Sequence, residues 1–184
     1  MQSEEVIQLL IDQTQEIIRQ VEKLRNADLE TLTWKRNQTS WSILECLEHL
    51  NLYGDFYLPE IENNIKETLT KNDAEFKSGI LGNYFAKSIL PKEHLNKMKT
   101  AKNKNPLNAN LDKTVIDKFI NQQIKLLDLL EQSRKVGLNK IRIQTSISRF
   151  IKLKLGDTFQ FVINHIFRHL NQIDKIQTEI KVQS

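Results

Sequence analysis

Apolar residues recur every three or four positions in four long stretches of the chain, and this spacing predicts four amphipathic helices. The first stretch covers residues 4–26, and the second begins at residue 42. The third covers residues 112–134, and the last covers residues 158–180. Four long helices favour an all-α fold, and we expect a four-helix bundle.

The start of the second helix carries the sharpest local signal. Ser42 and Glu45 have the spacing of a capping box, in which each side chain accepts from the backbone amide of the other residue. Trp41, just before the helix, is expected to be buried there. Pro59 removes one backbone donor and should kink or divide the helix. We expect Asp157 to be the N-cap of the last helix.

The connections between the expected helices differ in length. A short polar link joins the first two helices, which favours antiparallel neighbours. The second connection covers about residues 70–110 and can return along the bundle, so the second and third helices would run parallel. One short helix is expected near residues 83–90. Apolar residues alternate between positions 137 and 155, which predicts an extended segment through Ile141, Ile143, Thr145 and Ile147.

Composition supports a helical protein with a single domain, residues 1–184. Gly and Pro together make up 8 of 184 residues, about a third of ordinary usage, which argues against a turn-rich sandwich or barrel. The single cysteine, Cys46, excludes an internal disulfide and is interpreted as a packing residue. No apolar stretch is long enough to cross a membrane, and the acidic N-terminus is unlike a signal peptide. We therefore expect a cytoplasmic protein.

Charge is distributed unevenly along the chain. Residues 1–69 contain 6 Lys/Arg and 13 Asp/Glu, a net charge of −7, whereas residues 70–184 contain 21 and 10, a net charge of +11. Nucleic-acid-binding proteins show such asymmetry, but no nucleic-acid motif and no interleaved aromatic residues accompany these basic residues. We interpret them as a solvated surface and do not expect nucleic acid as a partner.

Three of the four histidines lie inside the expected helices. His165 and His169 are one turn apart and therefore share a helix face, while His49 lies two turns into the second helix. At about 1.5 Å per residue the three side chains can meet whether these helices run parallel or antiparallel. Three neutral imidazoles leave an open position on a divalent metal, as in catalytic zinc sites, and suit Zn or Ni. The alternative is a pair of partly exposed, hydrogen-bonded histidines. His94 is expected to be an exposed loop residue.

No side chain is assigned as catalytic. Glu45 lies one turn before His49 and can orient it, but the capping box already explains this glutamate. Gln172, one turn after His169, points either to the same cavity or to solvent. Two aromatic residues near His49 are interpreted as core residues, Tyr53 and Tyr57.

Two segments resemble the signature of the DinB/YfiT-like superfamily. Residues 41–50, Trp-Ser-Ile-Leu-Glu-Cys-Leu-Glu-His-Leu, resemble its Trp-Ser-x-x-Glu-x-x-x-His-Leu motif. Residues 165–172, His-Ile-Phe-Arg-His-Leu-Asn-Gln, resemble its closing His-x-x-Arg-His-x-x-Gln helix. The resemblance covers nearly the whole chain. It implies an up-down-down-up four-helix bundle and a divalent metal held by His49, His165 and His169.

The resemblance also implies a range of functions. Characterised members include thiol-dependent S-transferases and a maleylpyruvate isomerase, which use low-molecular-weight thiols such as bacillithiol or mycothiol, and other members are described as metal-dependent hydrolases. We therefore expect thiol S-transfer to a small electrophile, or hydrolysis, with a small-molecule substrate and a low-molecular-weight thiol as cosubstrate. The alternative is a non-catalytic, stress-related binding module. A homodimer is expected because bundles of this family are often dimers.

Overall fold

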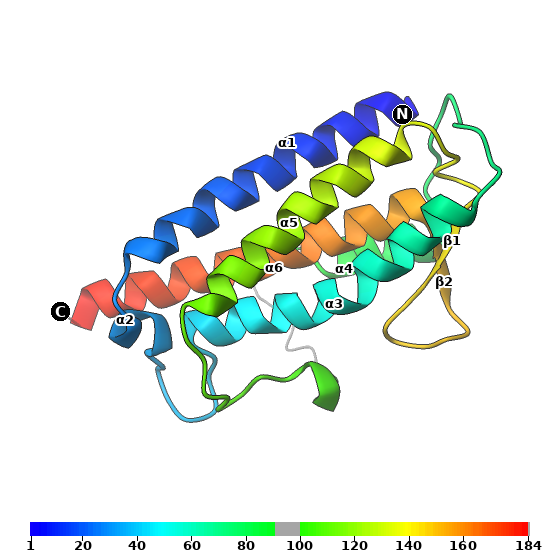
Figure 1. The fold of residues 1–184 in the computed structure, drawn as a ribbon. Helices are drawn as coiled ribbons and strands as arrows, with labels where there is room; N and C mark the ends of the chain where they lie inside the picture. The colour runs from blue at the N-terminus through cyan, green and yellow to red at the C-terminus, as the bar shows by residue number, and fades with distance from the viewer. Residues whose placement is uncertain (91–99, 184) are drawn as a thin grey trace.

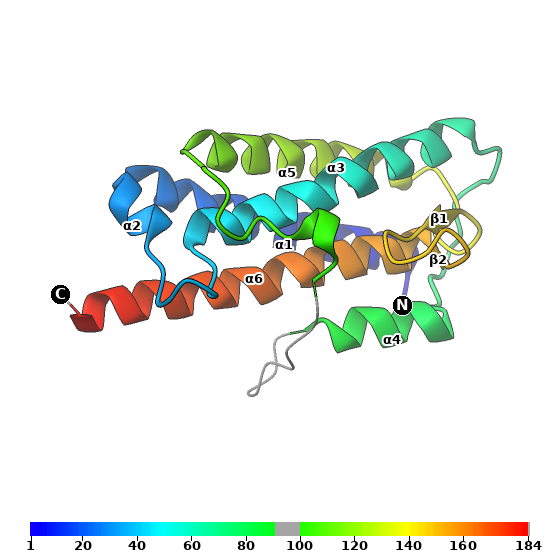
Figure 2. The same cartoon turned by 90° about the horizontal axis from the view of Figure 1, so that it is seen from below.

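Four long helices lie side by side in the computed structural model, which describes residues 1–90 and 100–183 (Figure 1). They are α1 (Ser3–Glu22), α3 (Ile43–Glu67), α5 (Thr114–Ser133) and α6 (Leu155–Gln183). Both α1 and α3 pack against α5 and α6. In both views α3 and α5 run in one direction, while α1 and α6 run in the other (Figures 1 and 2). The expectation of a mostly helical chain is confirmed.

One hydrophobic core lies between the four long helices. Each helix contributes fully buried side chains, among them Ile17, Leu47, Phe119 and Phe159. Burying a side chain of this size stabilises the fold by about 1.5–3 kcal/mol relative to leaving it in water. The core therefore fixes α3 against α6, which is the pair that carries the histidines. No helix in the described part of the chain has the length and apolar character needed to cross a membrane.

Short elements occupy the connections. They are η1 (Lys23–Asn26), α2 (Leu29–Thr33), α4 (Ile80–Ser88), η2 (Lys102–Lys104) and the strands β1 (Arg142–Gln144) and β2 (Lys152–Lys154). The expected short helix is α4, which begins three residues earlier than expected. The expected extended segment is an antiparallel hairpin, in which Ile143 lies opposite Leu153 and both are buried. Ile147, near the turn, is exposed.

The start of α3 confirms the capping box and corrects the expectation that Trp41 is buried. Ser42 Oγ accepts from the Glu45 amide at 3.2 Å, and Glu45 Oε2 accepts from the Ser42 amide at 2.8 Å. Trp41 is only partly buried, although it packs against the edge of the core. Of the two effects expected at Pro59, a kink or a division, the division does not occur, since one helix continues through this residue. The reason is that the residues beyond the proline, including the fully buried Ile61, still pack into the core and offset the lost donor.

Asp157 is not the N-cap of α6, contrary to the expectation. The helix begins two residues earlier, at Leu155, directly after β2. The Asp157 side chain is buried in the first turn, where it accepts from the Ser78 hydroxyl and from the Gly79 amide, the latter at 3.0 Å. A Cβ at Gly82 would lie 2.1 Å from Asp157 Cγ, so α4 approaches α6 at a distance that only glycine permits. Asp157 therefore anchors the long connection to α6.

Candidate metal centre

The packing of α3 against α6 brings together the three helical histidines. His49 comes from α3, and His165 and His169 come from successive turns of α6. All three are buried, with 3%, 5% and 7% of their surface exposed. His165 Nε2 lies 3.2 Å from His49 Nε2 and 3.1 Å from His169 Nε2. Three nitrogen atoms thus converge within a space that one metal ion can fill.

Hydrogen bonds at the outer nitrogens determine which atoms face the centre. His49 Nδ1 lies 2.6 Å from the Lys104 carbonyl oxygen, and His169 Nδ1 lies 3.1 Å from Gln172 Oε1. Both oxygens only accept, so both Nδ1 atoms donate and both Nε2 atoms carry a lone pair. A hydrogen on His165 Nε2 can satisfy one of these lone pairs but not both. A divalent cation would satisfy all three nitrogens, and the donor set therefore fits a metal.

Burial keeps the imidazoles neutral. It lowers the pKa of His49 to about 4 and that of His169 to about 3. Burial also holds the pKa of His165 well below its ordinary value, with a further lowering from its two histidine neighbours. Neutral imidazole is the form that binds metals. Near pH 7 the cluster therefore needs to release no proton before a cation binds.

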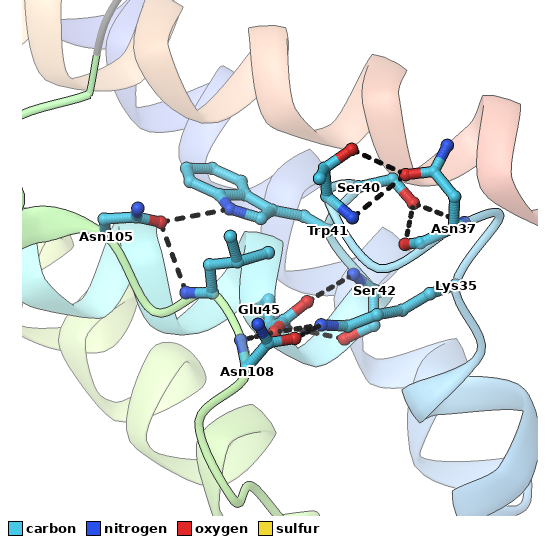
Figure 3. Close-up of polar contacts among 10 residues, drawn as sticks. Lys35, Asn37, Ser40, Trp41, Ser42, Glu45, Asn105 and Asn108 are labelled. Carbon is cyan, nitrogen blue, oxygen red and sulfur yellow. Dashed lines mark hydrogen bonds and ion pairs between the residues drawn. The ribbon is translucent and has the colours of Figure 1, made fainter.

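Glu45 anchors a distant segment to the start of α3, in addition to its role in the capping box. Its Oε1 accepts from the Asn108 amide at 2.5 Å and pairs with Lys35 Nζ at 2.6 Å (Figure 3). Lys35 also donates to the Asn108 side chain at 2.9 Å. The carboxylate therefore does not contact His49, and its interpretation as a cap is confirmed.

Trp41 binds the same part of the long connection at Asn105, nearer to the histidines than Asn108. Its Nε1 donates to Asn105 Oδ1 at 3.2 Å (Figure 3). Asn105 directly follows η2, and this contact helps to place the Lys104 carbonyl against His49. The oxygen that orients the first histidine is therefore a backbone atom supplied by the long connection.

Aromatic rings surround the histidines. The Trp41 ring lies 4.7 Å from that of His49 and 5.7 Å from that of His169, between ring centroids. The Tyr53 ring lies 4.9 Å from His49 and 4.5 Å from His165. The sequence placed Tyr53 near His49 and interpreted it as a core residue; the contact of its ring with His165 was not predicted. Its spacing of four residues from His49 was the available signal.

The remaining candidates have different surroundings. Gln172 points to the histidines and not to solvent, because its Oε1 contacts His169 Nδ1. Tyr57 is buried, and its hydroxyl bonds to Ser146. Burial raises the pKa of the Cys46 thiol, which makes it an unreactive packing residue. His94 lies outside the described residues.

A family model described as the DinB superfamily matches residues 10–173, and the chain therefore belongs to this superfamily. The match includes both histidine segments, and the resemblance noted from the motifs is confirmed. No curated protein and no solved structure matches the chain.

Proposed function

We propose that this member of the DinB superfamily is a metal-dependent enzyme that transfers a low-molecular-weight thiol to a small electrophile. In this proposal His49, His165 and His169 hold a divalent cation, Zn or Ni. The observation that carries it is the convergence of three buried, neutral imidazoles through their Nε2 atoms. A cation held by neutral ligands keeps its full charge, and it lowers the pKa of a thiol or water that binds to it.

The helix arrangement supports the finer fold assignment within this proposal. We infer that α1, α3, α5 and α6 form the up-down-down-up four-helix bundle that the family resemblance implies. The parallel course of α3 and α5 in Figures 1 and 2 supports it, as does the long connection between them. In such a bundle the histidines of α3 and α6 face each other across one seam.

The residues around the cluster fix the direction in which each imidazole presents its lone pair. The Lys104 carbonyl holds the proton of His49 on Nδ1, and Gln172 does the same for His169. Outer partners of this kind typically change metal affinity by 10–100-fold. Trp41 and Tyr53 cover the rings and exclude water from them. The chain thus holds the acceptors in place before any ligand binds.

The surroundings favour thiol transfer over hydrolysis. Among the described residues no carboxylate contacts the three histidines, and Glu45 is already bonded to Ser42, Asn108 and Lys35. Hydrolysis would need a general base to accept a proton from water. A thiol is far more acidic than water and can give its proton to solvent without such a base. Its thiolate then forms a bond to the electrophilic carbon while the bond to the leaving group breaks and that group departs with the electron pair. This difference is the reason for proposing transfer first and hydrolysis second.

The test compares turnover by metal-loaded wild type and His169→Ala. Each protein is incubated with 1-chloro-2,4-dinitrobenzene and a panel of bacterial thiols, and with water alone. We expect the wild type to exceed the variant with at least one thiol. Equal rates for the two proteins with every thiol and with water would contradict both reactions and favour a non-catalytic binding module.

A further inference from the structure

A cavity of about 1130 Å³ lies beside the histidine cluster. Its walls come from α4, η2 and the hairpin turn, together with one residue each of α3 and α6. Figure 2 shows α4 alongside the first half of α6. Near the end of α4 the Ala86 carbonyl accepts from Asn164 Nδ2 at 3.1 Å, one residue before His165. Ligand cavities typically measure about 300–1,000 Å³, so this one accommodates a small organic molecule with room for a second.

Within the described ranges 1–90 and 100–183, the walls of the cavity carry apolar side chains that are exposed. Ile80, Tyr84 and Ile147 are 92%, 67% and 58% exposed. Aromatic rings are prominent among the lining residues, namely Tyr53, Tyr84, Phe85 and Phe161. Gathered apolar side chains on a surface mark a binding groove, and aromatic rings favour an aromatic ligand through offset and edge-to-face contacts.

The charge of the lining has a single sign. Among the described residues that line the cavity, the charged ones are Lys87 and Lys104, and neither a glutamate nor an aspartate accompanies them. Lys104 Nζ lies 5.6 Å from the centroid of the ring of Tyr53, another residue of the lining. The ammonium donates to the Leu52 carbonyl, which leaves two of its three hydrogens for a ligand. Among the described residues no carboxylate forms an ion pair with it, although the charge of Asp55 opposes the lowering of the Lys104 pKa by burial.

The same residues connect the cavity with the histidines. Tyr53 lines the cavity and lies 4.5 Å from His165 between ring centroids, and Phe161 lines it and stacks on His165 at 6.0 Å. Lys104 lines the cavity, its backbone carbonyl accepts from His49 Nδ1, and its Nζ lies over the ring of Tyr53, which lines the same cavity. An anionic group bound to the Lys104 ammonium would therefore be held by the same residue whose backbone carbonyl contacts His49.

We propose that this cavity binds the electrophilic substrate, and that the substrate is an aromatic carboxylate. Its ring would pack between Tyr84, Ile147 and Phe161, and its carboxylate would bond to Lys104. Naming the ligand as the substrate rests on the proposed function. The binding site itself is independent of it, because the anion is held by a lysine and not by the histidines.

The test uses three ligands of nearly equal shape and different charge: 2-naphthoate, 2-naphthamide and 2-naphthylmethylammonium. Their dissociation constants are measured by ligand-observed NMR on the full chain. We expect wild type to bind naphthoate at least about tenfold more tightly than the amide, since a charge-assisted hydrogen bond is stronger than a neutral one. The cation should bind most weakly.

Matched variants assign the preference to one side chain. Lys104→Gln should lose the preference for naphthoate while it keeps its affinity for naphthamide, a pattern that misfolding would not produce. Lys102→Gln, an exposed lysine of the same short helix that does not line the cavity, should behave as wild type. Equal binding of acid and amide by wild type, or an intact preference in Lys104→Gln, would overturn the inference.

Two further samples separate this inference from the proposed function. Wild type stripped by a chelator and His169→Ala should both retain the naphthoate preference within twofold. Loss of the preference in both would place the anion at the histidines and overturn the inference, while leaving the metal site intact. A retained preference together with equal zinc binding by wild type and His169→Ala would support the cavity and contradict the proposed function.

Discussion

Two polar regions flank α3. One consists of paired charged side chains, and the other consists of neutral histidines. On the side of α5, Asp55 bonds to Lys118 and Gln122, each at 2.8 Å. Further along the same side, Glu62 pairs with Lys125 at 2.8 Å. On the side of α6, the three histidines present acceptor nitrogens to one another. On the α5 side these two carboxylates are paired with donors from the chain itself, whereas on the α6 side the nitrogens form a set that a divalent cation would complete.

The ionisation of the two regions shows the same contrast. Hydrogen bonds from Lys125 and Lys66 lower the pKa of Glu62 to about 2, so this region stabilises a charged side chain. Burial lowers the pKa of His49 to about 4, so the other region opposes a charged side chain. A matched ion pair holds helices together, while a cluster of neutral acceptors is suited to bind something that the chain does not contain.

The largest expected effect is on metal affinity. His165→Ala removes the nitrogen that lies between the other two, and we expect zinc affinity to fall by more than 100-fold, beyond the loss typical of an outer-shell change. Lys125→Met, which breaks the ion pair on the α5 side, should leave the affinity within twofold of wild type. Competition with a chromogenic chelator measures both, and an equal affinity in all three proteins would contradict the contrast.

The metal-free protein should lose stability in acid. The ordinary histidine pKa is 6.5, whereas His49 and His169 in the folded chain have pKa values of about 4 and about 3. Between these values the unfolded chain binds more protons, so stability is complete above pH 6.5 and falls as the pH drops toward about 3. Each histidine contributes a slope of about 1.4 kcal/mol per pH unit.

Urea unfolding in the presence of a chelator measures this slope. His49→Leu should give a shallower dependence because one of the contributing groups is removed. A slope that is identical in wild type and His49→Leu would show that the buried cluster does not control acid stability.

The outer partner of His169 should have an intermediate effect. Gln172→Leu removes the acceptor that holds the proton on Nδ1, and we expect metal affinity to fall by about 10–100-fold. Gln122→Leu is the matched control on the α5 side, where the amide bonds to Asp55 and to the Asn51 carbonyl. Calorimetric zinc titration distinguishes them, and similar losses in both variants would refute a specific role for Gln172.

The smallest expected effect belongs to the exposed ion pair on the α5 side. Lys118→Met removes the partner of Asp55, and stability should change by about 0.2–1 kcal/mol because exposed pairs contribute little. Zinc affinity should not change. Thermal unfolding measures the first quantity, and a loss of several kcal/mol would mean that this region contributes more than its exposure indicates.

The starts of α3 and α6 show how far local sequence determines structure. At α3 the capping box is complete within four residues, Ser42 to Glu45, and the sequence alone predicts it. At α6 an aspartate before an apolar helix has the same local pattern. Its partners, however, are Ser78 and Gly79, far away in the chain, so the local pattern predicted the wrong role for Asp157.

In the candidate site, too, the sequence predicts some of the contributing groups and not others. Helical spacing places His165 and His169 on one face, and helix register allows His49 to meet them, so the three residues could be proposed from sequence. The oxygen that orients His49 is the backbone carbonyl of Lys104, and a backbone atom has no sequence signature. Its position depends on the anchoring of residues 104–108 by Trp41 and Glu45, which only the folded chain reveals.

The most direct test of the central claim is X-ray absorption at the zinc edge of protein loaded with one equivalent of zinc. If the α6 side of α3 is completed by a cation, the spectrum should show three imidazole nitrogens and one exchangeable light atom, and His165→Ala should lose this signature. Failure of wild type to retain zinc, or a spectrum without imidazole scattering, would contradict the account.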